Sequence, residues 1–306
     1  MKNIILYIIT IIVWGSTFFA IKYQLGSVDP MVSVIYRFGL AAVLLILFCY
    51  VKGLTLKFSL YEHSFMALLG IFLFSVNYWF VYVAEIYVTS GVVAVIFSSI
   101  VFMNIANGAI FLRTAVEKKM IAGAVLGIIG IAMIFMTEIE TFDLSDKGVF
   151  GLCIAFISVL LASFGNIVSA RNTKNSIPVI QANAFGMAYG TIFLALIAFV
   201  SGKEFSFIVT IPYISSLFYL AVFGSIIAFG SYLTLIGSIG ADKASYAIMV
   251  VPVVALILSS FFEGYSWNFA GISGLLLVVG GNFLALSKAK YSIAGFKLQQ
   301  TWKPKG

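Results

Sequence analysis

The sequence predicts an all-α integral membrane protein of ten transmembrane helices, built as two inverted five-helix repeats. The composition, the spacing of apolar segments and an internal duplication lead to this prediction. The chain has 306 residues, of which 62% are hydrophobic and only 9% charged, and its mean hydropathy is +1.12. A soluble domain cannot cover so much apolar surface with so few charges. Lipid is therefore the expected solvent.

Ten apolar segments follow one another, separated by polar residues, Gly or Pro. Each is close to the ~20 residues of helix that cross a hydrocarbon core of roughly 30 Å. The first begins with Lys2 and an apolar run, as a signal peptide does, but it has no small-residue cleavage site, so we expect a retained span. In chain order, the predicted spans are 4–24, 31–51, 64–86, 91–112, 119–137, 149–170, 178–201, 212–236, 243–262 and 268–287.

The positive charges predict the orientation, because Lys and Arg gather in cytoplasmic connections. If the N-terminus is cytoplasmic, fourteen basic residues lie inside and three outside, with Arg37 left within a span. We therefore expect both termini in the cytoplasm. This asymmetry also explains the net charge of +7 without any nucleic-acid partner. The outside set is Lys22, Lys147 and Lys203; the inside set is Lys2, Lys52, Lys57, Arg113, Lys118, Lys119, Arg171, Lys174, Lys243, Lys288, Lys290, Lys297, Lys303 and Lys305.

The two halves of the chain resemble each other in outline. The stretch 84–101 matches 235–252 in length, and each is a tight turn that leads into an apolar span. GAVLGIIG at 123–130 matches GLLLVVGG at 274–281. An odd number of spans in each copy turns the second copy upside down, and inverted repeats place a substrate path near the bilayer midplane. The expected units are 1–142, 148–288 and a basic cytoplasmic tail, 289–306.

Four stretches carry a resemblance to a known family. These are WGSTFFAIK at 14–22, the spacing from Pro30 to Arg37 and Phe38, the GVVAVIF run that enters the fourth span, and VVPVVALILSSFFEG in the ninth. In order and spacing they resemble the drug/metabolite transporter superfamily, specifically its ten-helix EamA branch. The resemblance implies an inner-membrane carrier of amino acids, other metabolites or toxic compounds, often an exporter. It also implies a central cavity, with the fifth and tenth spans as supports.

Charged residues inside a span are costly and usually face a cavity or a helix end. Arg37 in the second span either attracts a carboxylate near the path or is a structural arginine that reaches a helix end or an interfacial carboxylate. Glu85, late in the third span, shares a helix face with Tyr78 and Tyr82. It either binds a proton or an amine at the outer mouth, or is a solvated helix-end acid. Glu263, at the end of the ninth span, fits a turn or cap role.

Polar and aromatic residues supply the other candidates. Intramembrane amides bind substrate or join helices, and aromatic rings stack on planar or cationic groups or simply pack. Pro252 interrupts the ninth span, and we predict a kink that either bends during gating or shapes the packing; its counterpart in the repeat is Val101, where the family often has proline. The remaining substrate-pathway candidates are Trp14, Asn77, Asn104, Asn107, Asn166, Tyr232 and Tyr246.

The predicted function is secondary active transport of a small metabolite, an amino acid or related compound, by alternating access and in the direction of export. An uptake carrier, such as an S-adenosylmethionine importer, and a lipid-handling membrane protein are the alternatives. No enzyme is expected, because the one histidine, His63, has no metal-ligand cluster or nucleophile near it, and no Gly-rich loop precedes a Lys-Ser or Lys-Thr pair. We expect no catalytic residue, cofactor or metal. The expected partners are a small-molecule substrate and the bilayer, and glycines such as Gly123 and Gly127 pack helices or form a homodimer surface.

Overall fold

The computed structural model describes residues 1–24, 26, 28–88, 93, 96–136, 146–262 and 268–287. Within these ranges every regular element is a helix. Glu263 and the predicted tail 289–306 lie outside the described residues, so their predicted roles stay predictions. The all-helical class is therefore confirmed for the described part of the chain.

The N-terminal half contains regular α-helices and others that include a 3-10 or π-helical segment. Helix α1 (Lys2–Ile21) ends in a short 3-10 turn, η1 (Lys22–Gln24), and α2 (Pro30–Val51) follows. The third predicted span is one long helix whose middle is π-helical: α3 (Leu60–Leu69), η2 (Gly70–Ser75) and α4 (Val76–Tyr87). The half closes with α6 (Ile100–Leu112) and α7 (Lys118–Ile134).

The C-terminal half repeats this order. It begins with α9 (Asp146–Lys174) and α10 (Val179–Val200). A second long helix with a π-helical middle then comprises α11 (Ile211–Tyr219), η3 (Leu220–Ile227) and α12 (Ala228–Ile239). A single helical turn, α13 (Ala241–Ala244), precedes α14 (Tyr246–Phe262) and α15 (Phe269–Leu286).

Local chemistry explains where several helices begin. Asp29 accepts a hydrogen bond from the Met31 amide at 2.8 Å, ahead of Pro30 in the first turn of α2. Ser59 and Glu62 form a capping box at the start of α3. These caps satisfy backbone N–H groups that a helix leaves free at its first turn, and so they fix the ends of the long helices.

Six helices among the described residues are long and apolar enough to cross a membrane. They are Pro30–Val51, Leu60–Tyr87, Lys147–Lys174, Val179–Val200, Ile211–Ile239 and Phe269–Leu286, and shorter apolar helices cover Lys2–Thr17 and Ile96–Leu112. Large apolar side chains also remain exposed along these helices, as lipid-facing surfaces do. The molecule is thus built as a helical membrane protein.

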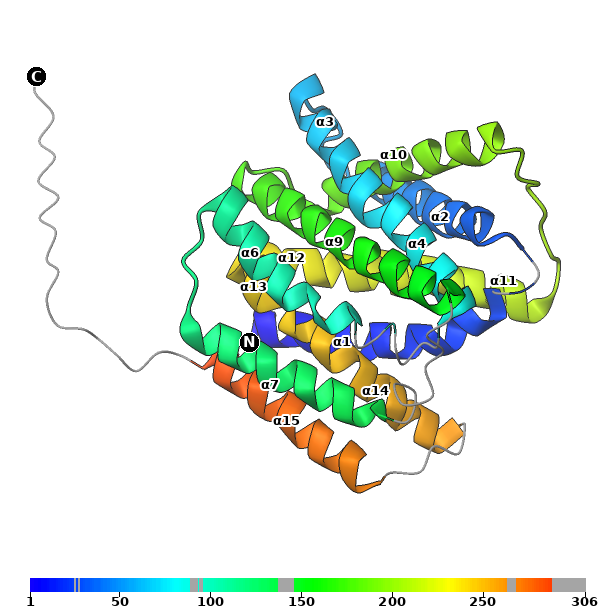
Figure 1. The fold of residues 1–306 in the computed structure, drawn as a ribbon. Helices are drawn as coiled ribbons and strands as arrows, with labels where there is room; N and C mark the ends of the chain where they lie inside the picture. Colours follow the sequence, from blue (N-terminus) through cyan, green and yellow to red (C-terminus); the bar gives the residue numbers. More distant parts are fainter. Residues whose placement is uncertain are drawn as a thin grey trace, which may run out of the picture.

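The packing pairs helices from the two halves (Figure 1). Helix α7 lies along α15, and α2 lies along α10. Helix α9 of the second half packs on α4 and α6, while α1 of the first half packs on α12 and α14. Each helix therefore finds its main neighbours in the other half, and the two halves are not separate globules.

The contact between α7 and α15 depends on glycine. A Cβ atom added to Gly123 would lie 2.5 Å from the carbonyl oxygen of Gly281, and one added to Gly130 would lie 2.5 Å from that of Gly274. Only glycine allows two backbones to approach this closely. These four glycines pack inside the chain, so they are not available as a dimer surface, and a homodimer stays a prediction.

Candidate functional site

A cavity lies between the two halves. Together with the open solvent space at its mouth it measures about 860 Å³. Its wall is apolar with a few polar groups, as is usual for small-molecule sites. The first half contributes Trp14, Thr17, Arg37, Leu73, Asn77, Tyr78, Val81, Glu85, Phe97 and Ile100, and the second half contributes Asn166, Phe229, Tyr232, Ile248, Val251 and Pro252.

Arg37 is the central charged group of this cavity. It comes from α2, is 1% exposed, and donates from Nε to Ser225 Oγ at 3.0 Å. Its guanidinium carbon lies 4.8 Å from the ring centroid of Tyr78 and 5.2 Å from that of Phe38. Nη1 has no hydrogen-bond partner among the described residues. Both predicted roles of Arg37, at the substrate path and as a structural arginine, stay predictions.

Both π-helical segments line or support this site. In η2 the Val76 amide bonds to the Ile71 carbonyl, and in η3 the Ala228 amide bonds to the Phe223 carbonyl, five residues back in each case. This register shifts carbonyl groups away from the regular α-helical ladder, and π-helical turns often occur at functional sites. The Leu73 and Gly224 carbonyls accept hydrogen bonds from the cavity residues Asn77 and Trp14, respectively.

Aromatic rings form the apolar wall. The Trp14 ring centroid lies 4.9 Å from that of Phe229 and 5.1 Å from that of Tyr232, and the Tyr78 centroid lies 5.9 Å from that of Phe229. Edge-to-face and tilted pairs of this kind hold rings in fixed positions. The wall is therefore shaped before any solute arrives.

Seven predicted pathway residues lie together in the cavity wall, and so does Pro252. Tyr82 is not part of the wall; its hydroxyl is buried, with no partner among the described residues. Their roles in transport stay predictions. The seven are Trp14, Arg37, Asn77, Tyr78, Glu85, Asn166 and Tyr232.

The other three candidates lie outside the cavity wall and join helices. Asn107 donates to Ser163 Oγ at 2.8 Å, and Asn104 donates to the Ala241 carbonyl at 3.2 Å. Tyr246 donates to the Met120 carbonyl and so ties α14 to α7. Their described contacts favour the structural alternative for these three residues.

Pro252 lies inside α14, and its neighbours Ile248 and Val251 also face the cavity. The hydroxyls nearest in sequence to the Ile248 carbonyl are engaged elsewhere, since Ser245 donates to the Asp242 carbonyl and Tyr246 to Met120. Neither hydroxyl therefore donates to the Ile248 carbonyl. This carbonyl also lacks its usual backbone donor, because Pro252 has no N–H. Val101, the counterpart of Pro252, is fully buried in α6 and is not part of the cavity wall.

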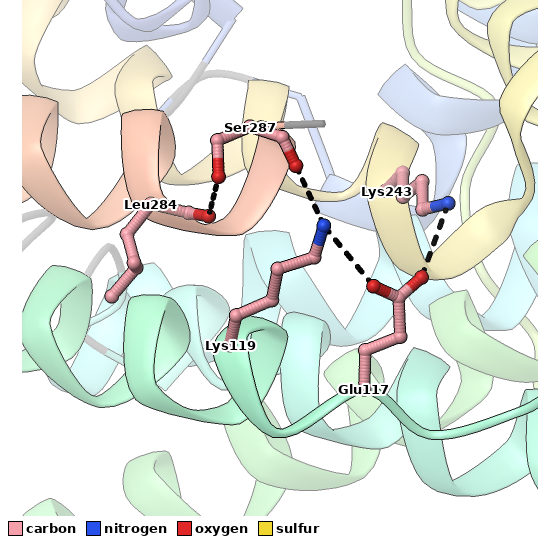
Figure 2. Close-up of polar contacts among 5 residues, drawn as sticks. All are labelled: Glu117, Lys119, Lys243, Leu284 and Ser287. Atoms are coloured by element: carbon pink, nitrogen blue, oxygen red, sulfur yellow. Dashed lines mark hydrogen bonds and ion pairs between the residues drawn. The ribbon is translucent and has the colours of Figure 1, made fainter. Parts of the chain in front are cut away.

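A polar cluster joins three connections at one end of the molecule (Figure 2). Glu117, which precedes α7, lies 3.1 Å from Lys119 Nζ and 3.6 Å from Lys243 Nζ of α13. Lys119 also donates to the Ser287 carbonyl at the end of α15, at 2.6 Å. The hydrogen bond from Lys119, helped by its charge and by Lys243, lowers the pKa of Glu117 below its ordinary value. The cluster thus holds α7, α13 and α15 together at this end.

Sequence reasoning missed most of the apolar wall, including Phe229, and it also missed Ser225, which bonds to Arg37. The predicted repeat could have found Phe229, because the spacing that matches Val101 with Pro252 also matches Tyr78 with Phe229. Ser225 had no sequence signal, since a serine in an apolar helix is common and its bond to Arg37 depends on tertiary packing.

Comparison with known proteins decides the family. The model of the EamA-like transporter family matches residues 1–136 and 149–287. The chain belongs to this family. The resemblance stated from the sequence is therefore confirmed, and EamA membership gives the chain a general role in transport.

Relatives of similar length share this description. The uncharacterized inner membrane transporter YedA of Escherichia coli is 29% identical over 287 residues, covering 90% of both chains. The uncharacterized transporter YyaM of Bacillus subtilis is 27% identical and covers 92% of this chain and 93% of its own. Protein PagO of Salmonella typhimurium is 23% identical and covers 92% of both. YedA and YyaM are named as transporters, which confirms that the EamA chain is a carrier and not an enzyme.

A solved structure, described only as the crystal structure of a protein, has the same fold. Its TM-score is 0.77 at 16% identity, and the alignment covers 93% of this chain and 96% of the other. The EamA chain therefore has a fold that experiment has already observed over nearly its whole length.

Proposed function

We propose that this EamA chain exports an amino acid or a related small metabolite across the bacterial inner membrane by alternating access, with the cavity as the binding site. The observation that carries the proposal is the cavity itself. It lies between the two halves, takes residues from both, and contains buried polar atoms without partners, such as Arg37 Nη1 and Asn166 Oδ1. A carrier needs such a site at the interface of the parts that move.

The mechanism requires two inverted five-helix repeats, and the contacts support them. If α1, α2, α3–α4, α6 and α7 correspond to α9, α10, α11–α12, α14 and α15, then α7 with α15 and α2 with α10 are pairs of equivalent helices. The packing of α9 on α4 and α6 is likewise repeated by that of α1 on α12 and α14. The π-helical segments η2 and η3 also occupy equivalent positions. This is the pattern that a two-fold axis between the halves produces.

We also propose that both termini face the cytoplasm. Tyr7, near the N-terminus, donates to Asn282 near the end of α15, and Lys119 reaches Ser287, so the two ends of the helical bundle meet on one side (Figure 1). Lys119 and Lys243, two of the predicted cytoplasmic cations, lie beside Glu117 on this side. Labelling of single cysteines introduced at each terminus, in intact cells and in inverted vesicles, would test the orientation.

Transport is tested by counterflow in proteoliposomes loaded with unlabelled solute. The panel contains the amino acids, nucleosides and S-adenosylmethionine, so that it includes the uptake alternative. We expect saturable exchange of at least one solute. Absence of exchange across this panel would contradict the proposal, and flux only into cells would contradict export.

Two tryptophan substitutions locate the path. Val81→Trp places a large ring in the cavity wall, and we expect it to abolish exchange. Val43→Trp is the control, because Val43 of α2 is 62% exposed and faces away from the cavity. Wild-type exchange by the Val81 variant would show that the solute does not pass through this cavity.

A further inference from the structure

The cavity stops short of the end of the bundle where its first and last helices meet, here called the terminal end. On α1, which starts at this end, the lining residues are Trp14, Thr17 and Ile21, all beyond the middle of the helix. None of the described lining residues belongs to α7, α13 or α15, the elements joined at the terminal end (Figure 2). Protein therefore fills the space between the cavity and the terminal end.

Polar contacts between the two halves run through this space. Asn166, in the cavity wall, donates to Asn104 Oδ1 at 3.4 Å, and Asn104 donates to the Ala241 carbonyl at 3.2 Å. Ala241 begins α13, whose Lys243 lies 3.6 Å from Glu117 at the terminal end. Each of these contacts joins a residue of the first half to one of the second.

One short segment of the second half takes part in most of these contacts. Residues 241–251, here called the strap, provide the Ala241 carbonyl and the Lys243 ammonium group. Farther along the strap, the Tyr246 hydroxyl donates to a backbone carbonyl of α7. The strap also lines the cavity, with Ile248 among others. It therefore separates the cavity from the terminal end.

The strap has a break in regular helix at each end. Gly240 lies between α12 and α13 with φ at 90°, a conformation that glycine adopts at little cost. At the other end Pro252 has no N–H, so the helix lacks the backbone hydrogen bond to the Ile248 carbonyl. Hinges are a few residues at the ends of elements that absorb a change in backbone angles. Gly240 and Pro252 have the chemistry of two such hinges.

The strap is held by contacts that can be broken and remade. Ala241 and Ala244 are buried but small, so α13 exposes little apolar surface when it leaves α6. Met249 fills the space beside Gly127 of α7, and methionine is an adaptable apolar side chain. Water can replace the polar contacts as the surfaces separate. These properties favour a reversible closure.

The ion pair of the strap belongs to the terminal end alone. By the spacing of the predicted repeat, Glu117 corresponds to Asn268 and Lys243 to Val92. Asn268 caps its own helix, α15, by accepting from the Gly271 amide at 2.7 Å, whereas the Glu117 side chain makes no capping bond to α7. Valine carries no charge, so the other end of the molecule cannot form the same pair. The carboxylate of Glu117 is thus left to bind Lys119 and Lys243.

We propose that residues 241–251 are a gate that closes the cavity at the terminal end, hinged at Gly240 and Pro252 and latched by the ion pair between Lys243 and Glu117. The gate is shut in this structure. Its opening breaks the polar contacts with the first half and admits water and solute from the terminal end, which is the cytoplasmic side in the proposed orientation. This inference rests on the proposed transport function.

The test measures access to the cavity from each side of the membrane. Ala162→Cys places a thiol in the cavity wall, in a chain whose native cysteines are removed by Cys49→Ala and Cys153→Ala. Labelling of this reporter thiol by a membrane-impermeant maleimide is followed in intact cells and in inverted vesicles. We expect slower labelling from the side of the terminal end than from the other side, because the gate is shut.

Charge changes at the latch should alter only the access from the terminal end. Lys243→Glu places a second carboxylate beside Glu117, and we expect labelling from this side to rise about two- to fivefold. Combining Lys243→Glu with Glu117→Lys restores opposite charges and should return labelling to the parent level. Lys203→Glu is the matched control, because Lys203 forms an ion pair with Asp29 at 2.8 Å, at the start of α2; it should leave labelling from the terminal end unchanged.

A second variant tests the buried part of the gate without a charge change. Asn104→Ala removes the hydrogen bond to the Ala241 carbonyl, and we expect labelling from the terminal end to rise at least about twofold. This variant decides the matter if Lys243→Glu does not fold.

The outcomes separate the gate from the transport function. Unchanged labelling in Lys243→Glu and Asn104→Ala, an equal rise in Lys203→Glu, or no recovery in the exchanged pair would overturn the gate. Saturable counterflow alongside such a result would leave the carrier function intact. The expected labelling without counterflow of any solute in the panel would contradict the carrier function alone, because labelling reports access and requires no transport.

Discussion

Replacing Gly281 by Ala should loosen the contact between α7 and α15. The new Cβ atom would lie 2.5 Å from the Gly123 carbonyl oxygen and 3.0 Å from the Gly127 amide nitrogen. A carbon and a carbonyl oxygen approach to about 3.3–3.6 Å, so the helices must separate by about 1 Å at this point. Both nearest atoms belong to the backbone, so no side chain can rotate to make room.

The neighbouring residue supplies the control. An added Cβ at Gly280 has nothing within 4 Å, although it belongs to the same turn of α15. Both substitutions gain about 1 kcal/mol from the higher helix propensity of Ala, but only Gly281→Ala has the steric cost, about 1–3 kcal/mol for an overfilled contact. The two variants should therefore differ by about 1–3 kcal/mol in stability, with Gly281→Ala the less stable.

Thermal unfolding in detergent, followed by tryptophan fluorescence or by loss of the monodisperse peak, measures the difference. For a chain of this size it corresponds to a midpoint roughly 2–10 °C lower for Gly281→Ala than for Gly280→Ala. Equal midpoints would refute the close packing of α7 on α15.

Three further predictions concern the ends and centre of the bundle. Pro252→Ala should slow counterflow without loss of solute affinity, because it restores a helix hydrogen bond where α14 is expected to bend; unchanged rates would leave the proline a purely structural role. Glu117→Gln should raise labelling of a cysteine placed near Lys243. The ion pair between Glu117 and Lys243 contributes only ~0.2–1 kcal/mol to stability, because it is partly exposed. The pKa of Glu117 is lowered, so its contribution is complete above the ordinary carboxyl pKa and is lost only as pH falls through the lowered value; the ratio of labelling in the variant to labelling in the wild type should therefore be constant between pH 6 and 8. Asn107→Leu should lower the unfolding midpoint without changing solute affinity, because it leaves buried Ser163 without its donor.

The sequence was sufficient for the all-helical membrane class and for most of the polar residues of the cavity, for physical reasons. Apolar length predicts where helices lie, and a charge or amide in such a helix must face the interior, which is why Arg37, Asn77 and Asn166 were found as candidates. Burial alone does not say what the amide contacts. Asn104 and Asn107 were equally good candidates, but they contact Ala241 and Ser163.

The π-helical segments could not be predicted in the same way. Neither η2 nor η3 contains a proline, and their sequences, GIFLFS and LAVFGSII, are as apolar as the α-helices around them. Their register depends on tertiary contacts, such as the hydrogen bond from Trp14 to the Gly224 carbonyl. A local sequence signal for such a contact does not exist, because the partners are far apart in the chain.

Under the proposed repeat, equivalent positions of the two halves line the cavity, but their chemistry differs. The spacing that matches Val101 with Pro252 also matches Phe97 with Ile248 and Ile100 with Val251. Both members of each of these two further pairs line the cavity.

The polar groups do not follow this pattern. By the same spacing Asn77 corresponds to Ala228 and Glu85 to Ile236, so the first half supplies most of the polar groups and the second half mainly apolar ones. Under the proposed repeat, a solute can keep its polar contacts with one half while apolar surfaces of the other half slide past it. Apolar contacts are non-directional and tolerate such movement, whereas hydrogen bonds lose their strength when the donor angle changes. Under the proposed mechanism, the uneven distribution of polarity lets the first half hold the solute while the second half, with Pro252 in its cavity-lining helix, changes its position around it.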